Sequence, residues 1–578
     1  MTEAVYPNTG PREEALAAPA GRPPLLRLSD AWLQRGLLAV VALYLIVSLV
    51  LPLYALLSKS MRARDGSFVG LANFELYAAT PALVDSLYNS LFIGALTTFI
   101  TIGLAFPFAY ALTRTCMPGR GLFRIVALVP ILLPSLLPGI GLVYLFGNQG
   151  LLKEWLFGAS IYGPIGIVIA EVFYTFPHAL MILITALSLA DARLYEAAQC
   201  LRASKLRSFL TVTLPAARYG LVSAALVVFT LVVTDFGAPK VIGGNFNVLA
   251  VDIYKQVVGQ QNFEMGAVVG LILLVPAALA FGIDRIVQRR QIAQLSARSV
   301  PYRPKPDTAL DLSMLGFCTL VSVAILSILG ICHFASLVQF WPYNLSVSLR
   351  HYQFEFMDGG GWDAYRNSLM MAGLTAIIGT AIIFIGAYLV EKARGVGSLS
   401  RGIVQLLAML PMAVPGLVLG LGYIFFFNEP ANPFNPLYGT LAILVICSIT
   451  HFYTVAHLTA STALKQIDGE FESVAASLKQ PFHRTLTRVT VPVCLPTILD
   501  IAIYLFVNAM TTVSAVVFIY STNTALASVA ILNMDDAGQL APAAAMGIVI
   551  FYTNAAAKIL HALAQWLVVG RFQRWRAA

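Results

Sequence analysis

The sequence predicts an all-α membrane protein of about twelve membrane-spanning helices, arranged as two parallel repeats of six. Three observations lead to this fold class. Of the 578 residues, 58% are hydrophobic and only 11% are charged, and the mean hydropathy is +0.79. Soluble domains carry about 25% charged residues, so a water-soluble globule is excluded. The charges also gather in short basic loops between long apolar stretches, and the two halves share short sequence matches at a nearly constant spacing.

Apolar stretches of about twenty residues, the length that crosses about 30 Å of hydrocarbon, divide the chain into its expected parts. Residues 1–35 are polar and rich in Pro and Ala, which predicts a disordered cytoplasmic tail. Residues 36–284 form the first repeat, 285–311 a basic cytoplasmic linker, and 312–578 the second repeat. The expected spans are 37–57, 88–112, 123–146, 162–187, 217–236 and 264–283, and then 313–338, 367–390, 402–427, 437–461, 495–519 and 541–566.

Basic residues in the short loops predict the side of the membrane on which each loop lies. Positive charges follow every even-numbered span, and these loops share one side if both termini are cytoplasmic. Lys59, Arg62 and Arg64, after the first span, are exceptions. We therefore expect a multi-pass protein of a bacterial inner membrane, in contact with the lipid bilayer. The net charge of +9 comes from these loops and does not indicate nucleic-acid binding.

Matching residues in the two halves indicate an internal duplication. The distance along the chain between matching residues stays close to that between Asn89 and Asn367. The matches are Asn89-Ser90-Leu91 with Asn367-Ser368-Leu369, Ala109-Tyr110 with Ala387-Tyr388, and Pro130 and Pro134 with Pro411 and Pro415. Six spans in each repeat place equivalent loops on the same side, so the repeats are parallel and not inverted. We expect the prolines to bend the third and ninth spans around a cavity.

A short Ala-rich helix is expected after the fourth span, at about 191–215, and another after the tenth, at about 468–492. Small side chains would let a partner approach the backbone, and charges would fix its register. Either copy alone could be an interfacial amphipathic helix, but two copies at matching places indicate coupling helices that pass a partner's movement to the spans. The residues assigned to coupling are Glu196, Ala197, Ala198, Arg202 and Ala203, and then Glu472, Ala475, Ala476 and Lys479.

These two segments resemble the EAA loops of permeases in binding-protein-dependent ABC importers. The resemblance covers about 88–283 and 367–566 and implies the type I importer fold. It implies a permease that moves a small solute from periplasm to cytoplasm and is not itself an enzyme. The implied partners are two copies of an ABC ATPase subunit and a periplasmic solute-binding protein. Members of the family usually have Gly where this chain has Arg202 and Lys479, which leaves the geometry of this turn open.

The remaining motifs bear on cofactors and catalysis. No G-x-x-x-x-G-K-[ST] phosphate loop occurs in the sequence, so we expect a partner ATPase to use ATP and Mg²⁺ and this chain to bind no cofactor. The six cysteines and the His, Asp and Glu residues show no spacing typical of a metal site. No arrangement typical of a catalytic site is present either.

Polar residues within the spans are candidates for the solute path, because polar groups are costly in hydrocarbon. They are Thr234, Asp235, Asn508, Thr511 and Thr512, at matching depth in the fifth and eleventh spans, together with Glu171 and His451. The alternatives are hydrogen bonds between helices for the hydroxyl and amide groups, and a structural pairing for Glu171.

Two sections of the chain resemble permeases assigned to 2-aminoethylphosphonate uptake. They are 236–244 with 251–256, and 509–516 with 531–538. The resemblance implies a zwitterionic solute, which neutral hydroxyls and amides could pass along. Fused ferric-iron permeases share the layout and are the alternative, although a hard trivalent cation would be expected to move between several carboxylates or phenolates, which these segments lack. A secondary transporter, with intramembrane carboxylates for ion coupling, is the less favoured alternative.

Overall fold

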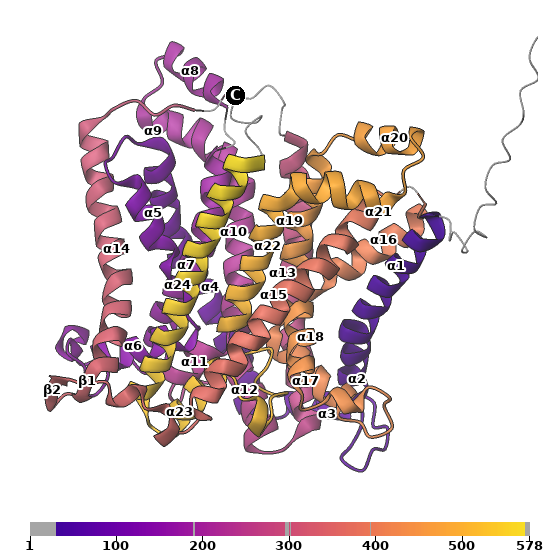
Figure 1. The fold of residues 1–578 in the computed structure, drawn as a ribbon. Helices are drawn as coiled ribbons and strands as arrows, with labels where there is room; N and C mark the ends of the chain where they lie inside the picture. The colour runs from indigo at the N-terminus through magenta and orange to yellow at the C-terminus, as the bar shows by residue number, and fades with distance from the viewer. Residues whose placement is uncertain (1–29, 189–190, 295–299, 301, 394, 573–578) are drawn as a thin grey trace, which may run out of the picture.

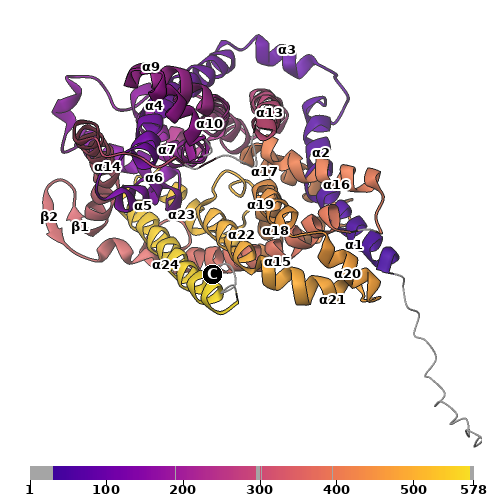
Figure 2. The same cartoon turned by 90° about the horizontal axis from the view of Figure 1, so that it is seen from above.

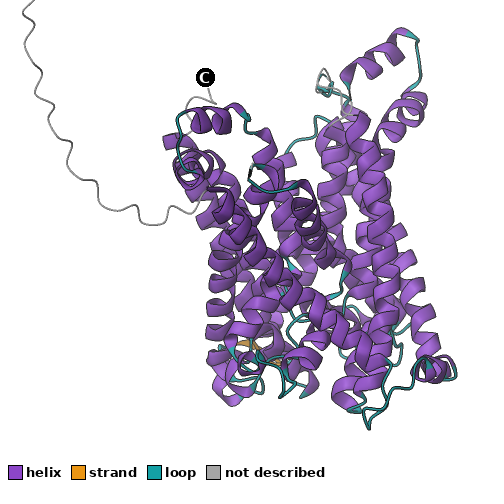
Figure 3. Cartoon of the chain, turned by 90° about the vertical axis from the view of Figure 1, so that its right-hand side faces the viewer, coloured by secondary structure: helices purple, strands orange, loops and turns teal. Residues whose placement is uncertain are grey.

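The structure is a computed structural model that describes residues 30–188, 191–294, 300, 302–393 and 395–572. Helices make up most of this part of the chain (Figure 3). Within it, nine helices are long and apolar enough to cross a membrane, or up to twelve if each of three bent helix pairs counts as one span. The all-α membrane fold class predicted from composition is confirmed.

The first repeat contains thirteen α-helices within the described residues. Helices α1 and α2 are joined by a π-helical turn at Ile46–Val50 into one span. The bounds are α1 (Asp30–Leu45), α2 (Leu51–Ser60), α3 (Ala72–Ala78), α4 (Pro81–Arg114), α5 (Arg120–Leu128), α6 (Leu136–Phe146), α7 (Pro164–Ser188), α8 (Ala192–Cys200), α9 (Lys205–Ser208), α10 (Leu214–Thr234), α11 (Gly237–Ile242), α12 (Leu249–Tyr254) and α13 (Phe263–Gln294).

The second repeat follows the same order, with a small antiparallel hairpin after its first helix. The hairpin strands are β1 (Val338–Phe340) and β2 (Asn344–Val347). The helices are α14 (Thr308–Leu337), α15 (Gly361–Glu391), α16 (Ser398–Met409), α17 (Gly416–Phe427), α18 (Leu441–His451), α19 (Tyr453–Gln466), α20 (Glu470–Ser477), α21 (Phe482–Thr485), α22 (Val491–Thr511), α23 (Ala527–Asp536) and α24 (Leu540–Phe572).

Several boundaries differ from the sequence-based expectation, and three of them change the predicted tail, linker or spans. Helix α1 begins at Asp30, inside the predicted tail, and the Asp30 carboxylate accepts a hydrogen bond from the Phe482 backbone N–H at 2.9 Å. Helix α13 continues to Gln294, into the predicted linker, because good helix formers and no Pro or Gly follow the apolar stretch. Helix α22 ends at Thr511, eight residues before the expected end of its span. Residues 1–29 lie outside the described part of the chain.

Proline breaks the third and ninth spans. Helices α5 and α6 meet at 105° across Pro134, and α16 and α17 meet at 112° across Pro415. Proline has no N–H to donate and disfavours helical geometry in the preceding residue. The predicted bends are therefore confirmed. The tenth span is also bent, by 55° between α18 and α19, although neither Pro nor Gly occurs there to predict it.

The first span of each repeat packs against the other repeat. In Figure 2, α1 and α2 lie beside α15, α16 and α17, whereas α14 lies beside α4, α5 and α6. Polar contacts join the exchanged helices to their hosts. The Tyr44 hydroxyl lies 3.0 Å from the Thr450 hydroxyl, and the Cys116 N–H donates to Asp311 at 2.8 Å. Neither six-span repeat is therefore complete by itself.

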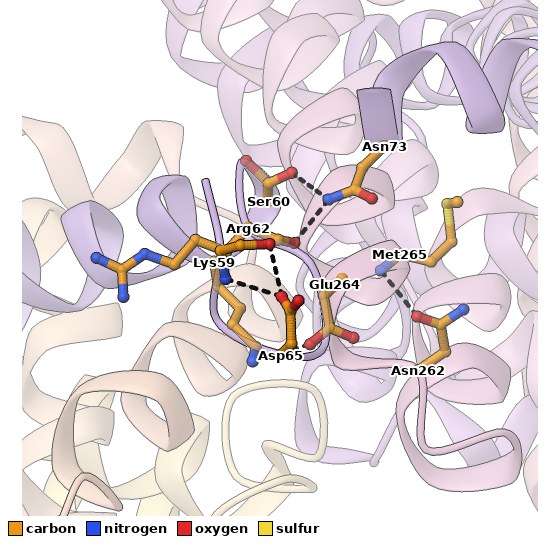
Figure 4. A network of polar contacts seen from close by, with 9 residues as sticks. Lys59, Ser60, Arg62, Asp65, Asn73, Asn262, Glu264 and Met265 are labelled. Carbon is orange, nitrogen blue, oxygen red and sulfur yellow. Dashed lines mark hydrogen bonds and ion pairs between the residues drawn. The ribbon is translucent and has the colours of Figure 1, made fainter. Parts of the chain in front are cut away.

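The end of α2 is tied to α13 and to the loop that follows it, at the opposite end of the molecule from α8 and α20 (Figures 1 and 4). The Lys59 ammonium lies 2.9 Å from the Glu264 carboxylate, and the Asn73 amide donates to the backbone carbonyls of Ser60 and Arg62. The charge of Lys59 is thus neutralised. This pairing accounts for one of the three exceptions to the distribution of basic loops.

Two glycines at matching positions allow the exchanged helices to approach. A Cβ atom on Gly422 of α17 would lie 2.8 Å from the Pro52 carbonyl oxygen in α2. A Cβ atom on Gly141 of α6 would lie 2.9 Å from the Cys332 sulfur in α14. Small residues commonly permit such close helix contacts in membranes. The same device therefore holds both exchanged helices.

We expect Gly141→Ala and Gly422→Ala each to lower the melting temperature of the purified protein. Overpacking costs about 1–3 kcal/mol, which outweighs the gain in helix propensity of about 0.5–1 kcal/mol. Gly402→Ala in α16 is the matched control, because nothing lies within 4 Å of its added Cβ. Equal melting temperatures for all three variants would contradict the close approach.

Candidate functional site

The two short helices α8 and α20 project from one end of the molecule (Figures 1 and 3). Helix α1 begins, and α24 ends, at this same end (Figure 1). Each short helix leads through a π-helical turn, Phe209–Thr213 or Leu486–Thr490, into a long span whose second residue is proline. The predicted matching placement of the two segments is thus present in the structure.

Both short helices end in the same turn although neither has Gly there. The N–H of Ala203 donates to the Ala198 carbonyl at 2.9 Å, and the N–H of Gln480 donates to the Ala475 carbonyl at 2.9 Å. In each turn the residue directly before the N–H donor, Arg202 or Lys479, adopts a left-handed φ angle, of 53° and 51° respectively. This is the helix-ending motif that usually carries Gly, and a side chain there costs about 1–2 kcal/mol. The open question about this turn is answered: the geometry persists with basic residues.

These hydrogen bonds correct the pairing of the two copies. The sequence motif pairs Glu196 with Glu472, but the matching turns align Tyr195 with Glu472 and Ala198 with Ala475. The shift arises because Glu196 lies six residues before the left-handed Arg202, whereas Glu472 lies seven residues before Lys479. Ala203 follows the first turn as Gln480 follows the second.

A cation at the end of the second span of each repeat holds the short helix. In the first repeat, the Arg114 guanidinium lies 4.9 Å from the Tyr195 ring centre, and the Tyr195 hydroxyl lies 3.0 Å from that of Thr213. In the second repeat, the Lys392 ammonium lies 3.7 Å from the Glu472 carboxylate and donates to the Ile467 carbonyl at 2.7 Å. Matching positions thus use a cation–π contact in one copy and an ion pair in the other.

The outer faces of α8 and α20 carry exposed apolar side chains. Leu201 is 82% exposed and Leu478 is 65% exposed, and a hollow of about 810 Å³ lies beside Phe471 and Leu478. Among the residues assigned to coupling, the exposed ones are Glu196, Ala197, Arg202 and Lys479. Ala203 and Ala475 are partly exposed, whereas Ala198 and Glu472 face inward. Ala476 lies in α20. Exposed leucines at the end of a membrane protein are typical of an interaction surface.

A cavity of about 170 Å³ lies between the two repeats, beside the proline break of the ninth span. It combines side chains from α7, α10 and α13 with residues from the break between α16 and α17 and from α17, α18 and α19. The predicted path residues Thr234, Asp235 and His451 line it. The full lining is Tyr174, Thr230, Leu231, Thr234, Asp235, Ala277, Pro411, Met412, Val414, Pro415, Gly416, His451, Thr454, Val455 and Ser514.

Glu171 lies behind this lining, against Asp235. Its side chain is fully buried, the two carboxyls contact each other, and neither Glu171 oxygen accepts a hydrogen bond from another described residue. Asp235 accepts the Ala238 N–H at 2.9 Å, which fixes its orientation at the end of α10. A carboxyl pair without a basic partner is an uncommon arrangement within a membrane protein.

Besides Glu171, three predicted path residues are not among those lining the cavity. The Asn508 amide donates to the Tyr504 carbonyl at 2.7 Å, the Thr511 hydroxyl donates to the Val507 carbonyl at 3.0 Å, and Thr512 is buried. Ser514, just beyond them, reaches the cavity. The sequence analysis missed Tyr174. Its position three residues after Glu171 on one helix, and thus on the same face, is a signal that could have identified it.

Replacing Arg202 with Gly should raise the melting temperature of the protein. Gly tolerates the left-handed φ of 53° without the steric cost of a side chain. Once the greater conformational entropy of Gly in the unfolded chain is subtracted, the gain in folding stability is up to about 1 kcal/mol. Ala197→Gly in the interior of α8 is the matched control and should lower the melting temperature. A lower melting temperature for Arg202→Gly would contradict the strained turn.

Comparison with known proteins agrees with the fold and its two repeats. Residues 94–293 and 381–565 match the family described as the inner membrane component of binding-protein-dependent transport systems. A Haemophilus influenzae protein named as a ferric transport system permease is 31% identical over 76% of this chain and 70% of its own length. The ferric transport system permease protein FbpB of Actinobacillus pleuropneumoniae is 29% identical over 81% of this chain and 69% of its own length.

Solved structures match as well, and one of them is a weak match. It is a bacterial ABC transporter that imports the acidic polysaccharide alginate, and the match has 13% identity and a TM-score of 0.36 over 46% of this chain and 96% of that one. The family match alone covers more than half of the sequence, in both repeats. Permeases of this family work with a substrate-binding protein and an ATPase. This chain therefore belongs to the inner membrane components of binding-protein-dependent transport systems, as a multi-pass ABC importer permease.

Proposed function

We propose that this chain is the permease of an importer for ferric ion, which passes through the cavity between the two repeats. The observation that carries the proposal is the group of side chains at this cavity: the Asp235 carboxyl with Glu171 behind it, the Tyr174 hydroxyl and the His451 imidazole. Hard cations prefer oxygen ligands. Two relatives that match both repeats are named for ferric transport, which supports the same cargo.

This proposal reverses the preference that the sequence segments gave to 2-aminoethylphosphonate. That preference rested on the resemblance of two segments to phosphonate permeases, and on the lack of several carboxylates or phenolates in the polar segments. Folding brings Glu171 and Tyr174 of α7 to Asp235, so the cavity combines donors from segments that are distant in sequence. Among the described residues, no group of three or more His, Cys, Asp or Glu could hold a metal ion. Two carboxyls with neutral donors would allow a cargo ion to pass on without being trapped.

We further propose that α8 and α20 each receive one ATPase subunit, with both chain termini in the cytoplasm. Two short helices of matching geometry on one end support two docking sites. Exposed Leu201 and Leu478 would enter the partner's surface, and Arg202 and Lys479 would set the register. The cations Arg114 and Lys392 connect each docking helix to a span, so movement of an ATPase would reach the cavity.

The cargo is tested in a strain that lacks this gene. We expect the wild-type gene to restore uptake of radioactive ferric iron, and Asp235→Asn to reduce that uptake about tenfold, equivalent to about 1.4 kcal/mol of lost cation binding. Asn can still accept the Ala238 N–H, so the fold should persist. Asp65→Asn, at an exposed outer loop, is the control. Lost growth on 2-aminoethylphosphonate as sole phosphorus source, with unchanged iron uptake, would instead favour the phosphonate.

The docking surfaces are tested by adding one charge to each. Leu201→Asp together with Leu478→Asp should reduce co-purification of the ATPase at least about fivefold, because burying an unpaired carboxylate in an interface costs more than 1 kcal/mol. Phe157→Asp is the control, since Phe157 is 97% exposed in the loop between α6 and α7, away from both short helices. Co-purification that is unchanged in the double variant would remove these helices as docking sites.

A further inference from the structure

A pocket lined by three arginines lies at the α8 end of the first repeat. It has a volume of about 470 Å³ and lies between the end of α4, the start of α5 and the end of α7. Arg114, Arg120 and Arg124 line it together with Tyr302, and no carboxylate is among its lining residues. In the part of the chain that the structure describes, none of the three arginines forms an ion pair.

The innermost of these cations, Arg114, is buried with unused hydrogen-bonding capacity. Its side chain is 5% exposed, and its Nη2 donates to the Leu187 carbonyl at 2.5 Å. The guanidinium lies 4.4 Å from the Tyr302 ring centre, but its Nε has no hydrogen-bond partner among the described residues. A buried cation is costly unless an anion accompanies it. The pocket therefore lacks a counter-ion.

The second repeat supplies the missing charges from its own chain. Lys392 and Arg401 stand where the first repeat has Arg114 and Arg120. Two carboxylates are close by. Glu472 pairs with Lys392 at the position of Tyr195, and Glu391 lies 3.3 Å from Lys465 at the position of Thr113.

The third arginine also lacks a counterpart, because Gln405 matches Arg124. Lys465 stands at the position of Ser188, so each repeat has three cations here, but the first repeat has neither of the two anions. Because the backbone of the two repeats follows the same fold here, a difference in fold does not explain the difference in side-chain charge. It points to an external anion.

The pocket lies where lipid headgroups meet the protein. Arg114 ends one membrane span, Arg120 begins the next, and Ser188 ends a third. Helix α5 also exposes apolar side chains, with Leu122 64% and Ile125 67% exposed. Basic pockets between spans recognise phosphate headgroups, and Arg binds phosphate with paired hydrogen bonds. We propose that this pocket binds the phosphate group of an anionic lipid from the leaflet on the α8 side.

A bound headgroup would also affect the docking helix. Arg114 contacts both the pocket and the Tyr195 ring of α8, and Tyr302 of the inter-repeat linker packs on the same ring with centres 4.6 Å apart. The linker is held to α8 by the Ala192 N–H, which donates to the Val300 carbonyl at 2.9 Å. The lipid phosphate therefore stabilises the position of α8, and the second repeat needs no lipid because Glu472 is part of the chain.

The test measures lipid retained by the purified full-length protein, using native mass spectrometry after incubation with equimolar phosphatidylglycerol and phosphatidylcholine. We expect wild type to retain phosphatidylglycerol in at least fivefold excess. Thr113→Glu and Arg120→Gln/Arg124→Gln should each remove that excess. Thr113→Glu and Arg124→Gln introduce the residue found at the matching place in the second repeat, which favours a preserved fold. Arg401→Gln is the matched control and should retain the excess.

Three results would overturn the proposal. One is an equal excess of phosphatidylglycerol in wild type and in both pocket variants. Another is the same loss in Arg401→Gln, which would indicate a general charge effect. The third is displacement of the lipid by 10 mM inorganic phosphate with the same dependence on Arg120 and Arg124, which would assign the pocket to free phosphate. Melting temperatures of all variants without lipid, if close to that of wild type, verify that a loss of retention does not reflect unfolding.

Discussion

Hydrocarbon offers no hydrogen-bonding partner to the backbone, and the arrangement of this protein follows from that constraint. Every span must bond its own N–H and C=O groups, so the spans are helices. A break is tolerable only where protein surrounds it, and the two sharp breaks at Pro134 and Pro415 are buried between the repeats. The cavity lies beside the second of these breaks. The helix interruptions and the candidate solute path therefore share one physical origin.

Duplication produced two nearly equivalent bundles, and the exchanged first spans make each depend on the other. The close approaches at Gly141 and Gly422 show that the exchange is symmetric in detail. The symmetry fails where charge is concerned. Arg114 meets a tyrosine ring whereas Lys392 meets a carboxylate, although both hold a short helix at the same end of the molecule. Two repeats in one chain can diverge in this way, because each copy then needs to satisfy only its own surroundings.

The candidate path depends on pairing across distance. Glu171 and Asp235 belong to different helices, and His451 reaches the cavity from the other repeat. Each is unremarkable in its own segment, where a single ionisable group in a span can be structural. Asp235 and His451 meet at one cavity with Glu171 behind Asp235, and this arrangement supports the proposal of a cationic cargo. The resemblance of short segments to phosphonate permeases could not include this, because it compared neighbouring residues only.

The sequence by itself determined the all-α membrane class, the two parallel repeats, the proline bends and the positions of the two short helices. These features follow from hydropathy, covalent geometry and local spacing, which act over a few turns of helix. Only the tertiary structure decided that the first spans are exchanged, that Tyr195 matches Glu472, and that Tyr174 lines the cavity while Asn508 and Thr511 bond their own helix. Such features depend on which helix faces meet, and a periodic apolar pattern does not specify its partner when lipid and protein are equally apolar.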